Sequence, residues 1–327
     1  MPASGGPKRI RFERKRDTLY FIFEVAHVLI GKPVCTFPGH ALGDGNDAMT
    51  TTSARTLAHL SRTILLVGAG KMGGALLEGW LALGLEARNL AVLEPKPARE
   101  LSALASRGLR LNPPAGSIGE ASAIIIAVKP QIAGEVMPGL APHVGAATVV
   151  LSIMAGQRLA FLEQALSQRA ALVRAMPNTP ASIGRGITVA VPNVRVSARQ
   201  RELAHALLSA TGAVEWIADE GLMDAVTAVS GSGPAYVFLL AEALAQAGAT
   251  AGLPTELAAK LARATVAGSG ELLQRSPLDP ATLRQNVTSP GGTTAAALEV
   301  LMSPHGLDEL MARAVAAAAA RSRQLGG

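Results

Sequence analysis

Short apolar runs alternate with helical patterns through the first two thirds of the chain. Each run has the length of a buried strand, and the segments between them hold turn residues or apolar residues at helical spacing. The runs expected to form strands are Thr63–Val67, Asn89–Leu93, Ala123–Val128, Thr148–Ile153, Ala171–Met176, Ile187–Val191 and Val214–Ile217. Helices are expected at Gly74–Leu85 and Ala198–Thr211. The alternation is typical of an α/β fold with a doubly wound parallel sheet.

The strand pattern stops after Glu220, and only helical patterns follow. The expected helices are Pro234–Gly252, Pro254–Leu273, Thr282–Val287, Thr294–Met302 and Leu307–Gln324. These helices are rich in alanine and apolar around much of their circumference, so they must be covered on most faces. About a hundred residues cannot provide that cover alone, and a homodimer built through this half is therefore expected. The alternative is a monomer whose helices fold back on the sheet.

The first sixty residues differ from the rest and are expected to form a disordered N-terminal extension. A basic run is followed by the apolar stretch Leu19–Ile30, which Glu24 and His27 interrupt. The stretch is too short for a spanning helix and lacks the features of a signal peptide. Met49 stands shortly before the first convincing strand, so the true start is expected there. We expect three parts, namely residues 1–60, a sheet domain at 61–219 and a helical domain at 220–327.

The charge, cysteine and histidine content reduce the number of function classes that fit the sequence. Residues 1–17 carry +4 of the formal net charge of +6, so the basic balance is largely local and nucleic acid is not an expected partner. The single cysteine, Cys35, excludes a disulfide framework within the chain and suits a reducing compartment, here the cytoplasm. None of the six histidines has a metal-ligand spacing, and no metal is expected.

A glycine motif stands between the first strand and its helix. Gly68 permits a tight turn, Gly70 lets the backbone approach a pyrophosphate, and Gly73 lets the helix pack closely on the strand. The amides at the start of that helix then face the phosphates. This context predicts a Rossmann domain that binds a nicotinamide dinucleotide.

The choice between NADH and NADPH stays open at this level. Glu94 ends the second strand, where an acid accepts hydrogen bonds from a ribose 2′-hydroxyl and repels a 2′-phosphate. Lys96 and Arg99 stand close enough in the sequence to bind such a phosphate. Either cofactor therefore remains possible.

A second constellation, from Asn286 to Thr294, precedes a helix of the second half. Gly291 and Gly292 expose backbone amides, and Thr293 and Thr294 add hydroxyls, which suits a carboxylate. The alternative is an ordinary cap in which a threonine serves its own helix. The second half offers no conspicuous proton donor, and this favours the reduction of a C=N bond over that of a ketone.

Five motifs together resemble pyrroline-5-carboxylate reductases. They are VGAGKMG (67–73), AVKPQ (127–131), VRAMPNTP (173–180), AVSGSGPAYVF (228–238) and NVTSPGGTTAAALEVL (286–301). The resemblance runs in order from about Thr63 to the C-terminus. It implies the reduction of L-1-pyrroline-5-carboxylate to L-proline with NADPH or NADH, the last step of proline biosynthesis. It also implies a Rossmann domain followed by an all-α domain that interlocks two subunits, with rings of dimers in many members.

The resemblance carries specific residues onto this sequence. Those implied to bind the cofactor are Gly68, Ala69, Gly70, Lys71, Met72, Gly73, Glu94, Pro95, Val128, Lys129, Ala155 and Asn286. Those implied to bind the substrate are Gly291, Gly292, Thr293, Thr294 and Glu220, with Thr294, Glu220 and Ser289 as catalytic residues. Glu220 could stabilise an iminium or simply end a strand. The extension before Met49 and the acidic Glu94 depart from the family. The alternatives are a related imine or β-hydroxyacid reductase and a non-catalytic NAD-sensing protein; no membrane is expected as a partner.

Overall fold

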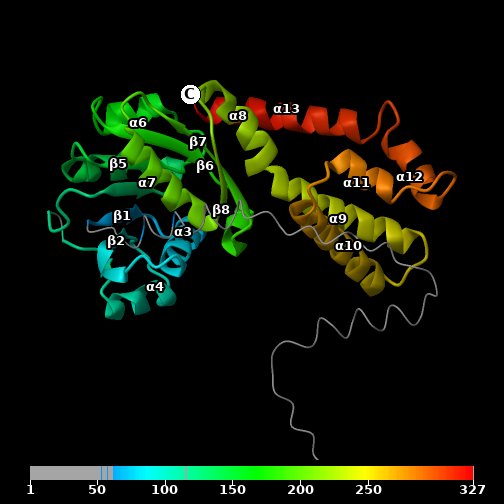
Figure 1. Cartoon of the computed structure of the whole chain (residues 1–327), viewed down its shortest axis with the longest axis horizontal. Coiled ribbons are helices and arrows are strands. Elements are labelled where there is room, and N and C mark those ends of the chain that lie inside the picture. The colour runs from blue at the N-terminus through cyan, green and yellow to red at the C-terminus, as the bar shows by residue number, and fades with distance from the viewer. Residues whose placement is uncertain (1–52, 54–56, 58–61, 115, 327) are drawn as a thin grey trace, which may run out of the picture. The chain divides into compact units, whose positions relative to one another are not determined.

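An eight-stranded sheet forms the first half of the part of the chain that this computed structural model describes, namely residues 53, 57, 62–114 and 116–326. All of these residues belong to one compact unit. The strand order is β3-β2-β1-β4-β5-β6-β7-β8 (Figure 1). The strands are β1 (Ile64–Val67), β2 (Leu90–Leu93), β3 (Arg110–Leu111), β4 (Ala123–Ile126), β5 (Val149–Ser152), β6 (Ala171–Met176), β7 (Gly186–Pro192) and β8 (Gly212–Trp216).

The direction of the strands changes once across the sheet. β1 to β6 run parallel, β7 pairs antiparallel with β6, and β8 runs parallel to β7. The chain builds outward from β1 to β3 and then returns to place β4 on the other side of β1, so the order reverses between β1 and β4. Open α/β sheets bind their ligands at such a switch point, outside the carboxyl ends of the strands.

The doubly wound α/β fold expected from the sequence is confirmed, with differences at the edges of elements. All seven predicted strands are present, and the two-residue edge strand β3 was missed. The predicted strand Ala123–Val128 ends at Ile126, because the chain turns there beside the glycine loop. The helix expected from Gly74 begins at Lys71.

Helices cover both faces of the sheet, and the sheet separates the apolar core into two clusters. Ile64 and Leu66 of β1 lie in one apolar cluster, and Leu65 and Val67 lie in the other, as the alternation of a strand requires. The covering helices are α3 (Lys71–Ala82), α4 (Arg99–Leu104), α5 (Ala133–Val136), α6 (Leu159–Ala165) and α7 (Ala198–Leu208). The buried Trp80 of α3 donates from Nε1 to the carbonyl oxygen of Leu207 at 2.8 Å, which joins α3 to α7. Short 3-10 turns are η1 (Ala87–Asn89), η2 (Ala105–Arg107), η3 (Pro130–Ile132), η4 (Met137–His143), η5 (Thr179–Ile183), η6 (Ser209–Thr211) and η7 (Glu220–Leu222).

Only helices follow η7 in the described chain. They are α8 (Met223–Val226), the π-helical turn η8 (Thr227–Gly231), α9 (Gly233–Thr250), α10 (Thr255–Arg275), α11 (Pro280–Asn286), α12 (Thr293–Leu301) and α13 (Leu307–Leu325). α9 and α10 pack as a hairpin, and α13 returns to α8. There Ser322 donates a hydrogen bond to Asp224 at 2.6 Å. The all-helical second half expected from the sequence is thereby confirmed.

The helices of this half expose apolar side chains. Val237, Phe238, Leu239, Leu240 and Leu244 of α9 are between 44% and 62% exposed. The segment Glu220–Thr250 is long and apolar enough to cross a membrane by length and composition, although such a test is also passed by helices of soluble proteins. Exposed apolar surface on this scale indicates a covering partner.

Two residues of the expected N-terminal extension belong to the fold. Ser53 and Leu57 are helical and buried, Leu57 joins the core cluster of Trp80, and Ser53 accepts a hydrogen bond from Ser209 at 2.9 Å. For these two residues the prediction of disorder is wrong, because Leu57 supplies apolar side-chain volume to the core. The rest of the expected extension lies outside the described residues.

The stability of the sheet domain is expected to fall as the pH falls. Burial, and to a smaller extent the guanidinium of Arg201, lower the pKa of His205 below its ordinary 6.5, while Glu215 acts in the opposite direction. The neutral ring is also needed because Nδ1 accepts from Nε1 of Trp216 at 3.3 Å. Below pH 6.5 the unfolded chain binds more protons than the folded one, so the stabilisation is complete above 6.5 and is lost as the pH falls through the lowered pKa.

Thermal unfolding measured between about pH 7.5 and about pH 5 checks this contribution, since a histidine titrates there. The midpoint is expected to fall more steeply in the parent protein than in His205→Gln. Parallel curves would contradict the assignment to His205.

Candidate active site

The glycine loop is tightly packed on one side and open on the other. Gly68 has φ +89, and a Cβ there would lie 2.9 Å from the carbonyl oxygen of Ala127. A Cβ at Gly73 would lie 2.2 Å from the carbonyl oxygen of Gly68. Gly70 has nothing within 4 Å of its Cβ position, so it faces open space. Two glycines are therefore required by the fold, and the third is free to admit a ligand.

The start of α3 is suited to an anion. Its N-cap is Gly70, and no side chain caps the helix, so its first amides are left to other partners. Unpaired amides and the positive end of the helix dipole favour phosphate groups. The open side at Gly70 and this uncapped helix end fit the pyrophosphate of a dinucleotide.

Gly70→Ala is expected to weaken dinucleotide binding by roughly tenfold or more, because its methyl group would occupy the open side where the backbone must approach the pyrophosphate. The free energy of unfolding should change by no more than about 1 kcal/mol, since the new Cβ meets no protein atom. Titration calorimetry with NAD⁺ and thermal unfolding measure the two effects. A large loss of stability would show that Gly70 serves the fold instead.

Glu94 is tied to the glycine loop. Its Oε2 accepts from the amide of Ala69 at 2.9 Å and its Oε1 accepts from the amide of Lys96 at 3.0 Å. Asn112, which the sequence did not single out, holds the backbone of Glu94 on both sides, at 2.8 Å and 2.9 Å. The carboxylate is therefore fixed beside the loop at the end of β2.

The other predicted cofactor contacts lie at the ends of neighbouring strands. The side chain of Val128 lies beside Gly68, and Lys129 is exposed at the start of η3. Ala155 is exposed after β5, whereas Gly156 is buried against the end of α13, where its Cβ position lies 3.3 Å from the carbonyl oxygen of Leu325. The structure thus brings the glycine loop, Glu94, Val128, Lys129 and Ala155 to one edge of the sheet.

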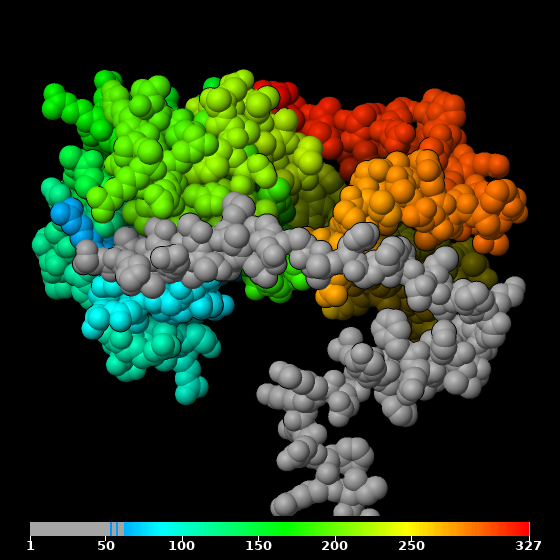
Figure 2. All heavy atoms as spheres, in the orientation of Figure 1, coloured from blue at the N-terminus to red at the C-terminus, as the bar shows by residue number. Residues whose placement is uncertain are grey.

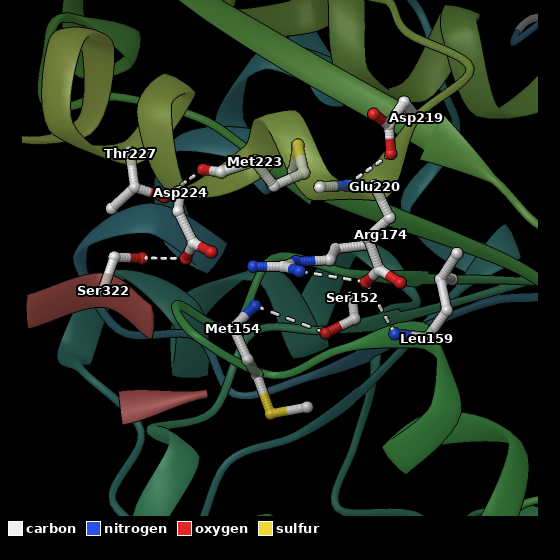
Figure 3. Close-up of polar contacts among 11 residues, drawn as sticks. Ser152, Met154, Leu159, Arg174, Asp219, Glu220, Met223, Asp224, Thr227 and Ser322 are labelled. Atoms are coloured by element: carbon white, nitrogen blue, oxygen red, sulfur yellow. Dashed lines mark hydrogen bonds and ion pairs between the residues drawn. The ribbon is translucent and has the colours of Figure 1, made fainter. Parts of the chain in front are cut away.

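Glu220 is committed to another partner. Its Oε1 accepts from the guanidinium of Arg174 at 2.9 Å and from the amide of Leu159 at 2.8 Å (Figure 3). Arg174 lies on β6 with its side chain only 5% exposed, so this pair joins the sheet and α6 to the first turn of the helical half. The contacts favour a structural role over the predicted role at the substrate, which stays a prediction without a supporting contact.

The turn before α12 presents amides and hydroxyls. Gly291 has φ +69, and Gly292 is the N-cap of α12, which no side chain caps. The ordinary-cap alternative for Thr293 and Thr294 is therefore wrong. Within the described residues, the side-chain hydroxyls of Ser289, Thr293 and Thr294 form no hydrogen bond. These groups are left to bind an external anion.

The two predicted half-sites do not meet within one chain. The described hydrogen bonds of residues 286–294 are all local, and no described ion pair links them to the sheet domain. Figures 1 and 2 show α11 and α12 on the far side of the helical half from β1 and β2. Asn286 is the last residue of α11, and no described hydrogen bond or ion pair joins it to the glycine loop.

Fold and site together define a class: a nicotinamide-dependent oxidoreductase with a Rossmann domain and a separate helical association domain. Family comparisons agree with this division. Residues 63–156 match the model described as NADP oxidoreductase, coenzyme F420-dependent, and residues 220–325 match pyrroline-5-carboxylate reductase dimerisation. The exposed apolar helices are therefore a dimerisation surface, and the chain forms a homo-oligomer.

This chain matches individual relatives over almost their whole length. The pyrroline-5-carboxylate reductase of Pseudomonas aeruginosa is 40% identical over 265 residues, 80% of this chain and 96% of the relative, and that of Synechocystis is 41% identical over 80% and 97%. The crystal structure of the Coxiella burnetii enzyme is 32% identical, with a TM-score of 0.76 over 82% of this chain and 100% of that one. The Plasmodium falciparum enzyme with NADP bound is 30% identical, with a TM-score of 0.69 over 82% and 99%. The chain belongs to the pyrroline-5-carboxylate reductase family, as the resemblance in the sequence predicted.

Proposed function

We propose that this chain reduces L-1-pyrroline-5-carboxylate to L-proline with NADH or NADPH, the last step of proline biosynthesis. The observation that carries the proposal is the pairing of an open glycine loop in one half with an uncapped, hydroxyl-bearing helix start in a half that matches the family's dimerisation domain. The first suits a dinucleotide and the second suits a small carboxylate.

The cofactor-binding residues of the proposal are the loop Gly68–Gly73, Glu94-Pro95, Val128-Lys129, Ala155 and, from the helical half, Asn286. When bound, the reduced nicotinamide supplies a hydride to the carbon of the C=N bond. The protein's contribution is to hold the two ligands at the strand ends and to exclude water from between them.

The substrate is held by its carboxylate. The amides of Gly291, Thr293 and Thr294 and the hydroxyls of Ser289, Thr293 and Thr294 donate to the carboxylate oxygens, and this fixes the ring relative to the cofactor edge. Gly292 shapes the turn, because its amide donates to the carbonyl oxygen of Ser289 at 3.0 Å. Orientation of this kind contributes about 7–11 kcal/mol to the lowering of the barrier when the reacting atoms are aligned. The imine nitrogen is basic enough to take its proton from water, and the protonated imine is already electrophilic, so no strong general acid of the protein is required. Thr294 and Ser289 thus act on the substrate, and Glu220 acts as the pair of Arg174.

The site is completed by a homodimer, because the turn of one chain cannot reach its own glycine loop. Each active site then combines the sheet domain of one subunit with the Ser289–Thr294 turn of its partner. Rings of such dimers, a cytoplasmic location and the absence of nucleic-acid and membrane partners belong to the same proposal. The clustering of the net charge at residues 1–17 supports the absence of a nucleic-acid partner, and the single cysteine supports a cytoplasmic location.

The deciding experiment follows NADH or NADPH oxidation by the purified protein with L-1-pyrroline-5-carboxylate and with acyclic keto acids, and identifies the product. We expect proline to form from the cyclic imine alone. Turnover of β-keto or other acyclic acids would favour a related reductase. Dinucleotide binding without turnover of any imine would favour an NAD-sensing protein.

Thr294→Ala is expected to raise KM for the imine by roughly tenfold or more, since a hydrogen bond to a charged group contributes about 1.5–3 kcal/mol. NAD⁺ affinity should be nearly unchanged. The matched control is Thr288→Ala, because the Thr288 hydroxyl donates to the carbonyl oxygen of Arg284 in the same segment. Steady-state kinetics and calorimetry measure both quantities, and equal losses of imine and NAD⁺ affinity in Thr294→Ala would contradict the assigned role.

A further inference from the structure

The carboxylate of Glu94 has acceptor positions to spare at the cofactor edge. A carboxylate offers about four acceptor positions on its two oxygens. One on each oxygen is used, by the amide of Ala69 and by the amide of Lys96. Ala69 is the middle residue of the glycine loop, so the remaining positions lie beside the groove where the adenosine half of a dinucleotide would bind.

Asn112 holds the backbone from which this carboxylate projects. It has φ 46, the only positive φ of a non-glycine residue in the described chain, which places it in the left-handed region just after β3. In this conformation its side chain accepts from the amide of Glu94 and donates to the carbonyl oxygen of Glu94. Its own amide donates to the carbonyl oxygen of Val92, so the end of β2 is held by three hydrogen bonds from one residue. The backbone of Glu94 is therefore fixed, and the amides of Ala69 and Lys96 hold its carboxylate beside the loop.

The chemistry of a fixed carboxylate discriminates between the two dinucleotides. The adenosine ribose of NADH presents a 2′-hydroxyl and a 3′-hydroxyl, both of which can donate to a carboxylate. The 2′-phosphate of NADPH presents acceptor oxygens and carries negative charge. It therefore repels the Glu94 carboxylate and offers no donor to the lone pairs of the carboxylate oxygens.

Two cations nearby do not offset this effect. Lys96 and Arg99 are exposed, and neither side chain forms an ion pair within the described residues. Exposed, solvated cations contribute little to the binding of a charge and are screened by salt. Glu94, by contrast, is partly buried and is held by two amides.

We propose that Glu94 is the residue that makes this chain select NADH over NADPH, and that Asn112 is its positioning residue. The inference rests on the proposed function only for the identity of the cofactor class and not for the imine.

Titration calorimetry of the full chain with NAD⁺ and with NADP⁺ tests the proposal without turnover. The parent protein is expected to bind NAD⁺ about tenfold or more tightly than NADP⁺, the ratio that hydrogen bonds to a charged group supply. Glu94→Gln should bring the two Kd values to within roughly threefold of each other, because the charge is gone. Glu100→Gln, which removes a neighbouring exposed charge, should leave the ratio unchanged. A ratio from one sample is insensitive to partial unfolding, which affects both ligands equally.

Asn112→Gly keeps the left-handed backbone accessible and removes only the side-chain brace. It is expected to reduce the NAD⁺-to-NADP⁺ preference by several-fold while KM for the imine stays the same. Equal affinity for the two dinucleotides in the parent protein, or a preference for NADP⁺, would overturn the inference. So would a Glu94→Gln variant that keeps the parent ratio. A selective NAD⁺ binder that fails to reduce the imine would instead sink the proposed function and leave this inference standing.

Discussion

Gly73→Ala is expected to abolish measurable dinucleotide binding and to lower the melting temperature by several degrees. The alanine Cβ would lie 2.2 Å from the carbonyl oxygen of Gly68, which is part of the loop that the ligand must contact, and 3.2 Å from the Cβ of Ala127, which follows β4. Relief requires α3 to move away from β1, which disturbs the packing of its buried residues Leu76, Leu77 and Trp80. Overpacking of this kind costs about 1–3 kcal/mol. Binding should weaken by at least about 100-fold, because a displaced helix start no longer directs its amides at the pyrophosphate.

The adjacent glycine provides the matched control. A Cβ at Gly74 would lie 3.7 Å from the carbonyl oxygen of Ala69, an ordinary contact, and this residue lies inside the helix. Gly74→Ala should therefore stabilise the protein by about 0.5–1 kcal/mol through its better helix propensity and leave binding unchanged. Calorimetry with NAD⁺ measures the dinucleotide affinity of both variants, and thermal unfolding measures their stability. Similar behaviour of the two variants would show that close helix–strand packing at Gly73 is unimportant.

Two inactive variants are expected to restore activity to each other when they share a dimer. Gly70→Glu places a negative charge beside the pyrophosphate, and Thr294→Glu places one beside the substrate carboxylate; each should lower kcat/KM by about 100-fold or more through like-charge repulsion. Neither change should harm the fold, since Gly70 faces open space and an acid suits the first turn of α12. In a mixed dimer with composite sites, one of the two sites combines both intact halves. Isolated mixed dimers should then have about half of the parent activity, and a randomly paired mixture, in which half of the dimers are mixed, about a quarter.

Co-expression of the two variants with different affinity tags, followed by isolation of the mixed dimers, measures this restoration. Mixing of a variant with itself is the control and should stay inactive. Absence of activity in purified mixed dimers would mean that each chain builds its site alone, and the composite site would have to be abandoned.

The parts of the fold that depend on local patterns could be predicted from the sequence. The strands of the parallel sheet are continuous apolar runs such as Ile64–Val67 and Ala123–Ile126, and the glycine loop follows the first of them directly. The two-residue β3 was missed because Arg110 and Leu111 carry no recognisable period. Leu57 was assigned to the extension because the few apolar residues around it, such as Leu60, form too short a pattern to indicate a helix.

The parts of the site that depend on pairing across the fold could not be predicted. Asn112 lies 18 residues beyond Glu94, and only the register of β2 with β3, which pairs Val92 with Leu111, brings the two together. An asparagine such as Asn112 is one signal for a left-handed turn, but it does not identify the residue that its side chain will contact. Arg174 and Glu220 are 46 residues apart and meet because β6 ends where the helical half begins.

The packing of the last turn of α13 against Gly156 has a consequence for the order in which the protein is made. A Cβ at Gly326 would lie 2.6 Å from the carbonyl oxygen of Gly156, so the two backbones are in direct contact although the whole helical half separates them along the chain. Domains fold as units during synthesis, beginning at the amino end. The sheet domain can therefore fold on the ribosome, but the loop of Ala155 receives its backing only after α13 has been synthesised. A nascent subunit thus acquires its finished nucleotide edge only once the helical half has followed the sheet domain out of the ribosome.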